Sequence, residues 1–371
     1  MVEHTPVEVE PANGRAPTDR LWLSVGLAVG LILFVAGPVI ETGSPRGHAL
    51  VLESASWADT IMEEGPQSVL AEAREEAPLG FLSRWLTTAT LLLNPTGDDV
   101  TWARALACIV WMLSWWGIVR FIADREIRVR DPMPWLVLGV LLMSGPVRSA
   151  ATGDLAGAWM LAAGVLFAAA CKRLARAPQS TWSVGFLWGL LVLIHPALLA
   201  LGIPIFIFAA QAYGAQERAP AGEPGHAPLP SVPVSLLLSP AVAGLVVLIL
   251  WSLGGGSIRE LITSVDHLWR QTHPTTQTAL SAASPGMSIW TGLMSFGWAP
   301  TTLAAAGALI PGMNRQGKIA LFILATVFIA GGLNGRIDHT DANLMLFLAT
   351  PLLALSMRIP IALWTAERSD D

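Results

Sequence analysis

The sequence has few charged residues for its length. Asp, Glu, Lys and Arg make up 13% of its 371 residues, whereas a soluble globular domain carries about 25%. Hydrophobic residues make up 53%, and the mean hydropathy is +0.56. Such a chain has too few polar side chains to cover its own surface in water. The composition therefore argues against an ordinary soluble protein and predicts one whose solvent is lipid.

Cysteine, tyrosine and positive charge are also scarce. The two cysteines, Cys108 and Cys171, lie in or beside apolar runs far apart in the sequence, so we expect no disulfide. The formal net charge of −5 argues against a nucleic-acid partner, which calls for a basic face. By contrast, 16 Trp accompany the single Tyr, and Trp is enriched where membrane helices meet the headgroups.

Long apolar runs are what the sequence has in abundance. A spanning helix needs about 20 mainly apolar residues, and residues 21–40 form such a run. The segment before it lacks the basic stretch of a signal peptide, and no small-residue cleavage site follows. We therefore expect a retained anchor. Further runs lie at 103–122, 135–147, 155–171, 182–213, 234–253, 288–310, 318–333 and 342–357. The run at 135–147 has only 13 residues, which leaves open a tilted span, a re-entrant segment or a locally thinned bilayer.

The run at 182–213 is too long for one span. Its 32 residues would reach about 48 Å as a single helix, and Pro196 and Pro204 interrupt it. We expect two short spans that turn near His195. The prediction is then an all-α, polytopic integral membrane protein with about ten transmembrane helices. Ten spans from a cytoplasmic start place 14 of the 22 Lys and Arg inside and 8 outside, which satisfies the positive-inside rule better than nine spans would.

The apolar runs divide the chain into successive parts. These are a cytoplasmic tail at 1–20, an N-terminal membrane module at 21–213, a Pro-rich cytoplasmic linker at 214–232, a C-terminal membrane module at 233–358 and a cytoplasmic tail at 359–371. Two pairs of small residues four apart, Gly26 with Gly30 and Gly185 with Gly189, are expected on helix-packing faces.

The N-terminal module contains a large outside loop at 41–102, with ten acidic and three basic residues. A loop of this length is expected to have structure of its own. We expect short helical runs at 58–62 and 79–93, the second lying in the membrane interface rather than crossing it.

Several short motifs follow the first apolar run in order. They are Leu52-Glu53, the segment SASWADTIMEEG at 54–65, Glu76-Ala77-Pro78-Leu79, an interfacial run at 80–93, Ala103-Arg104-Ala105-Leu106, a short run at 135–146, Arg148, Gly153-Asp154, a run at 155–171, and Gly189-Leu190-Leu191-Val192-Leu193-Ile194-His195.

The order and spacing of these motifs over residues 20–210 resemble the polytopic GT-C glycosyltransferases. The resemblance is strongest to the branch of dolichyl-phosphate-mannose-protein mannosyltransferases and aminoarabinose transferases. That family has an Asp-Glu pair after its first span, where this chain has Leu52-Glu53. The family's Gly-Leu motif ends in Lys, where this chain has His195, and its late Arg-Tyr motif before a Pro is absent from 343–351.

The resemblance implies an inverting membrane glycosyltransferase of the cell envelope. It would transfer a sugar from a polyprenyl-phosphate-linked donor to a lipid, glycan or protein acceptor at the outer face of the cytoplasmic membrane. Such a reaction needs a carboxylate that takes the acceptor's proton, and cations or hydrogen-bond donors for the leaving phosphate. The candidate catalytic acids are Glu53, Asp154 and Asp59. The candidate phosphate-binding residues are Arg104, Arg148, His195, Arg270 and Arg336.

Several of these candidate residues also have a purely structural interpretation. Asp154 fits a helix N-cap or a pair with Arg148, His195 fits a helix end, and most acids of the 41–102 loop fit a solvated surface. No metal cofactor is expected, because the Asp and His spacings fit no strong metal template. A GT-C-like scaffold without activity remains an alternative. So does a transporter or flippase of a lipid-linked substrate, although that class predicts ionisable residues inside the spans rather than in the loops.

Overall fold

The structure is a computed structural model that describes residues 16–40, 45–65, 68–69, 81–95, 97–123, 127, 131–176, 180–217, 232–253, 255–264, 293–294, 296–333 and 342–361. Within these ranges the chain forms helices and turns and no strand, which confirms the all-α prediction. The main helices are α1 (Ala16–Ile40), α2 (Pro45–Glu64), α4 (Phe81–Leu92), α5 (Asp99–Ile122), α6 (Met133–Met143), α7 (Gly145–Thr152), α8 (Leu155–Leu174), α9 (Thr181–Ile194), the 3-10 helix η3 (Pro196–Leu201), α10 (Gly202–Glu217), α11 (Val232–Leu253), α14 (Trp298–Leu309), α15 (Arg315–Leu333) and α16 (Ala342–Ser356).

Within the described residues, three helices are long and apolar enough to cross a bilayer by length and composition: α5, α8 and the segment Leu344–Ile361. Two bent pairs pass the same test, and they raise the number to five if each pair is one span. One pair is α6 with α7, bent by 97°, and the other is Leu237–Leu253 with Ile258–Ser264, bent by 114°. These helices are consistent with an integral membrane protein, whereas the ten spans and the domain boundaries stay predictions.

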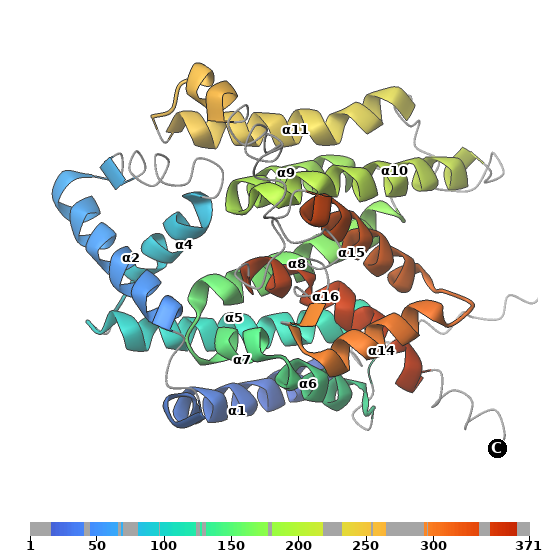
Figure 1. The fold of residues 1–371 in the computed structure, drawn as a ribbon, viewed down its shortest axis with the longest axis horizontal. Coiled ribbons are helices and arrows are strands. Elements are labelled where there is room, and N and C mark those ends of the chain that lie inside the picture. Colours follow the sequence, from blue (N-terminus) through green and yellow to red (C-terminus); the bar gives the residue numbers. More distant parts are fainter. Residues whose placement is uncertain are drawn as a thin grey trace, which may run out of the picture.

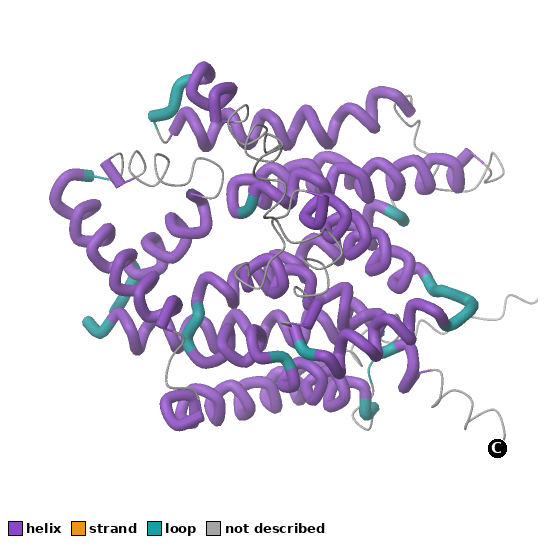
Figure 2. The backbone as a smooth tube through the Cα atoms, in the orientation of Figure 1, coloured by secondary structure: helices purple, strands orange, loops and turns teal. Residues whose placement is uncertain are grey.

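Most of the long helices lie side by side, and short loops join several of them (Figures 1 and 2). Glycines bring the backbones close at two of these contacts. Gly185 and Gly189 of α9 face α11, and a Cβ on Gly189 would lie 2.7 Å from the carbonyl oxygen of Ala243. Gly26 and Gly30 of α1 face side chains of α5 in the same way. Both predicted small-residue pairs are therefore confirmed as packing faces.

The central helix of the bundle is α16 (Figure 1). All of its side chains from Leu344 onward are buried, and it packs against α8, α14 and α15. Gly164 of α8 meets the backbone of α16 at Phe347, and Gly307 of α14 meets it at Leu355, so neither position has room for a Cβ. A helix that is apolar all round is expected at such a buried place.

Helix boundaries follow the prediction in some places and depart from it in others. The break near His195 is confirmed, because α9 ends at Ile194 and η3 starts at Pro196. The predicted short helix at 58–62 is wrong in extent, since α2 runs for 20 residues from Pro45. The run at 135–147 also fails to form one helix. Pro146, in the first turn of α7, cannot extend the hydrogen-bond ladder of α6, and the chain bends there.

Candidate functional site

Helices α2 and α4 lie across one end of the bundle, at the left of Figure 1. We refer to this end, where α5 and α8 begin, as the capped end. Trp102 of α5 donates its indole N–H to the carbonyl oxygen of Thr90 in α4, at 2.9 Å. Ala55 and Ala58 of α2 pack into the same apolar cluster as Leu155, the first residue of α8. The described part of the 41–102 segment is therefore folded against the bundle.

Helix α2 also contributes to an apolar cluster with α9 and α11. Trp57 is 5% exposed and shares an apolar cluster with Leu193 of α9, Trp251 of α11 and Leu261. Helix α2 thus bridges the start of α5 and α8 to the end of α9 and α11. Two of the predicted site residues, Glu53 and Asp59, lie on this helix.

Arg104 binds backbone from two other helices at the capped end. Its Nη2 donates to the carbonyl oxygen of Phe34 in α1 at 2.7 Å, and its Nε donates to that of Thr152 in α7 at 3.3 Å. Its guanidinium carbon also lies 5.1 Å from the centre of the Phe34 ring. Arg104 therefore joins α1, α5 and α7.

Asp154 is the N-cap residue of α8. Its carboxylate accepts a hydrogen bond from the N–H of Gly157 at 2.9 Å, which confirms the N-cap interpretation. Burial raises the pKa of the Asp154 carboxyl above its ordinary value, and the bond from Gly157 acts in the opposite direction. A Cβ on Gly153 would lie 3.1 Å from Cγ of Arg104. The structure thus brings the side chain of Arg104 against the backbone beside Asp154.

Arg148 and His195 occupy structural positions at helix ends. Arg148 donates from Nη1 to the carbonyl oxygen of Leu142 at 2.8 Å, so its guanidinium spans the bend between α6 and α7. His195 is the C-cap residue of α9, and its backbone N–H donates to Leu191. The helix-end interpretation of His195 is confirmed.

The remaining candidates are either exposed or wholly or partly outside the described residues. Glu53 lies on α2, two residues before Ala55, and its side chain is outside the described part of the structure. Asp59, also on α2, is exposed to solvent. Arg270 and Arg336 lie outside the described residues. Within the ranges that the structure describes, no three His, Cys, Asp or Glu side chains group as metal ligands would.

One polar residue of the capped end was not among the candidates. Asp98 caps α5, accepting hydrogen bonds from the hydroxyl of Thr101 at 2.6 Å and from the N–H of Val100 at 3.1 Å. The side-chain bond from Thr101 is the largest of the effects that lower the pKa of Asp98. An Asp just before a long apolar run is an N-cap signal, and it was available in the sequence.

Comparisons of the chain with protein-family models, with curated proteins and with solved structures find no match. The resemblance to GT-C enzymes therefore depends on the order of motifs in the chain itself.

Proposed function

We propose that this protein is a polytopic membrane glycosyltransferase that uses a polyprenyl-phosphate-linked sugar at the outer face of the cytoplasmic membrane. The observation that carries the proposal is the capped end, where α2 and α4 fold across the starts of α5 and α8, beside Arg104 and Asp154. Transfer from a lipid carrier needs a proton acceptor and a cation close to the carrier phosphate. The acidic segment folded onto the helices would supply such groups if it lies at the membrane surface.

The proposed reaction is a single displacement at the anomeric carbon. The acceptor's oxygen or nitrogen forms the new glycosidic bond as the bond to the carrier phosphate breaks. The phosphate leaves with the bonding electron pair, and a carboxylate takes the acceptor's proton. Glu53 would be this base by its motif position. Asp154, whose carboxyl has a raised pKa, is the second acid of the site.

In this proposal a carboxyl holds the acceptor's proton and a cation stabilises the leaving phosphate. A carboxyl with a raised pKa holds a transferred proton better than an ordinary one. The side chain of Arg104 packs on Gly153, the residue before Asp154. A cation there would offset the charge of the leaving phosphate. The partners implied are the donor lipid, the bilayer and a glycan, lipid or protein acceptor.

A non-catalytic scaffold with a GT-C-like arrangement is the second candidate function. The hydrogen bonds of Arg104 and Arg148 go to backbone carbonyls, and Asp154 caps a helix. These contacts stabilise the capped end whether or not a substrate is present. They favour the scaffold over a transporter, because they join helices rather than line a path between them.

Sugar transfer in membranes separates these two functions. Membranes containing the full chain are incubated with radiolabelled polyprenyl-phosphate mannose or polyprenyl-phosphate aminoarabinose, and label is counted in lipid, glycan and protein fractions. We expect transfer from one donor. Glu53→Gln and Asp154→Asn are expected to lower the rate about a hundredfold or more, as loss of a general base does.

The matched control is Glu63→Gln, which removes an exposed acid from the same helix as Glu53. It is expected to transfer like the wild type. Asn is itself a good N-cap residue, so Asp154→Asn keeps the cap of α8. Absence of transfer from both donors would favour the scaffold. Equal rates of transfer in the wild type and all variants would contradict the roles of Glu53 and Asp154.

A further inference from the structure

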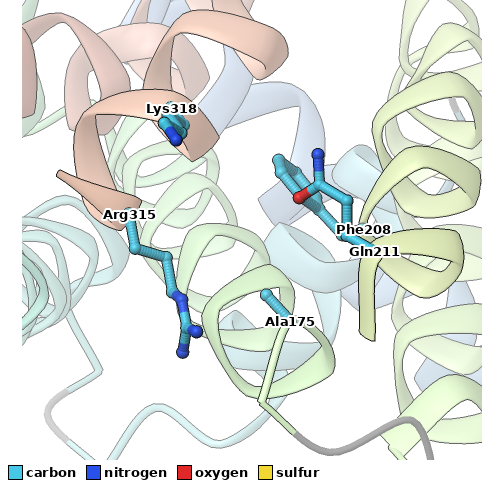
Figure 3. Close-up of a pocket in the computed structure, with 5 residues that line it drawn as sticks. All are labelled: Ala175, Phe208, Gln211, Arg315 and Lys318. Carbon is cyan, nitrogen blue, oxygen red and sulfur yellow. The ribbon is translucent and has the colours of Figure 1, made fainter. Parts of the chain in front are cut away.

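A cavity of about 240 Å³ lies between α8, α10 and α15 (Figure 3). Its lining consists of Ala175, Phe208, Gln211, Arg315 and Lys318. Helix α8 starts at the capped end, and its 20 residues carry the chain about 30 Å before Ala175. The cavity therefore lies at the opposite end of the bundle from α2 and α4, and we refer to this as the basic end.

The start of α15 is held firmly beside this cavity. Asn314 accepts a hydrogen bond from the N–H of Gly317 at 2.8 Å, which caps the helix. Arg358 donates to the carbonyl oxygens of Gly307 and Ile310, and so fixes the chain that leads from α14 into α15. The first turn of α15 is thus positioned by contacts that do not use its own basic side chains.

Two cations in this first turn have an unfavourable electrostatic position. Arg315 and Lys318 are three residues apart, so they lie on one face of α15. They also lie at the positive end of the helix dipole, where cations are disfavoured. Both are exposed, and neither side chain makes a hydrogen bond or ion pair with another residue that the structure describes. A bound anion would offset the two charges and the dipole together.

Further basic residues lie at the ends of neighbouring helices. Arg120 lies in the last turn of α5, and Lys172 and Arg173 lie in the last turn of α8. Lys172 donates to the carbonyl oxygen of Phe121 at 3.2 Å, so its charge is directed at α5. Positive potential focused on a concave site raises the local concentration of anions.

The cavity also has the shape and neighbours of a headgroup site. Its volume is below the roughly 300–1,000 Å³ of sites for drug-sized molecules, which suits a phosphate-bearing group. The side chain of Gln211 extends from α10 into the gap before α15 and brings a neutral amide to the cavity (Figure 3). Leu321, one turn beyond Lys318, is 38% exposed and offers apolar surface beside it.

We propose that the cavity at the basic end binds the phosphate of an anionic phospholipid headgroup, with Arg315 and Lys318 as its cationic contacts. Gln211 donates to the headgroup, and the acyl chains lie along the apolar surface of α15. Basic pockets between membrane helices on the cytoplasmic side take such headgroups. This site is at the other end of the molecule from Asp154. The proposal that it binds a lipid does not depend on the proposed glycosyl transfer.

Lipid retention by the purified full chain tests this site. The protein in a neutral detergent is titrated with phosphatidylglycerol or phosphatidylcholine, and bound lipid is counted by native mass spectrometry. We expect one tightly retained phosphatidylglycerol and no comparable phosphatidylcholine. The double variant Arg315→Gln with Lys318→Gln is expected to weaken retention about tenfold or more, because hydrogen bonds to charged groups are strong.

Two single variants with the same change in net charge separate a built site from general attraction. Gln211→Glu places an acid in the cavity, whereas Arg173→Gln removes an exposed base from the same end. We expect Gln211→Glu to weaken phosphatidylglycerol retention and Arg173→Gln to leave it nearly unchanged. Equal losses in the two variants would overturn the site in favour of diffuse surface attraction.

Soluble competitors identify the source of the phosphate. Glycerol 3-phosphate and inorganic phosphate are added at the concentration of the lipid, and neither is expected to displace it. Full displacement by either would identify a soluble anion as the ligand and overturn the lipid headgroup. Equal retention of phosphatidylcholine and phosphatidylglycerol would also overturn the proposal.

Discussion

At the capped end, the guanidinium groups of Arg104 and Arg148 bind backbone carbonyls, whereas at the basic end Arg315 and Lys318 line a cavity. Side chains of the same charge thus do different work at the two ends. A cation that binds carbonyls from other helices holds the fold together, and its loss leaves polar groups without partners. A cation that faces a cavity contributes little to folding and is available for a ligand.

The largest expected effect separates these two kinds of cation. Arg104→Met leaves the carbonyls of Phe34 and Thr152 without their charged donor. We expect it to lower the free energy of unfolding by about 3 kcal/mol or more, since each such bond contributes about 1.5–3 kcal/mol. Arg315→Met is the matched control, and in neutral detergent it is expected to change stability by about 0.5 kcal/mol at most.

Tryptophan fluorescence during denaturation of the purified protein measures both variants. Similar destabilisation by Arg104→Met and Arg315→Met would contradict the distinction between the two ends.

A smaller effect is expected at the N-cap of α8. Asp154→Ala removes the acceptor of the Gly157 N–H and is expected to lower stability by about 1 kcal/mol. Asp154→Asn keeps a cap and is expected to retain most of that stability. Unfolding curves of the two variants provide the check. If both lost stability equally, the charge of Asp154 rather than its cap would be what stabilises the capped end.

The pH dependence of stability is expected to have opposite signs for two acids of the capped end. The pKa of Asp98 is lowered, so its stabilising contribution exists above the ordinary carboxyl pKa and is lost as pH falls through the lowered value. The pKa of Asp154 is raised, so the folded state binds its proton more tightly than the unfolded state. Its contribution is greatest below the ordinary carboxyl pKa and is lost as pH rises through the raised value.

Stability of Asp98→Asn and Asp154→Asn, measured from acid to neutral pH against the wild type, shows both signs. As pH falls, Asp98→Asn is expected to approach or exceed the wild type, whereas Asp154→Asn is expected to fall below it. Parallel curves for the two variants would contradict the assigned pKa directions.

The smallest effect is expected from an exposed base outside the lining of the cavity between α8, α10 and α15. Arg173 lies in the last turn of α8 and is exposed. Arg173→Gln is expected to change stability by about 0.5 kcal/mol at most. A larger loss, measured by the same denaturation, would mean that the basic end also depends on its charges for folding.

The sequence predicts the helices best where apolar runs and prolines agree. The break at His195 follows from Pro196, and the glycine pairs of α1 and α9 follow from their spacing. A re-entrant segment was one of three alternatives for the short run at 135–147, but the position of the bend between α6 and α7 was not predicted. The apolar run continues through the bend, although Ser144-Gly145-Pro146 marks the place. The early start of α2 was missed because Pro45 and its polar neighbours resemble a loop, and its packing against other helices is set by tertiary structure.

The candidate site is predicted less completely. The N-cap role of Asp154 is local, so the sequence contains it. The contacts of Arg104 join residues 48 and 70 positions away, and no local pattern indicates them. The cavity of the basic end was missed because Arg315 and Lys318 were interpreted only as charges that set membrane orientation. Their shared helix face was visible, but the approach of α8 and α10 was not.

The orientation of the two ends tests the account most directly. Met62 of α2 is 80% exposed at the capped end, and Arg173 is exposed at the basic end, whereas both native cysteines are buried. Cells that express Met62→Cys or Arg173→Cys are treated with a membrane-impermeant maleimide before and after permeabilisation. The account predicts that Met62→Cys reacts in intact cells and that Arg173→Cys reacts only after permeabilisation. The reverse pattern, or reaction of both from the same side, would contradict it.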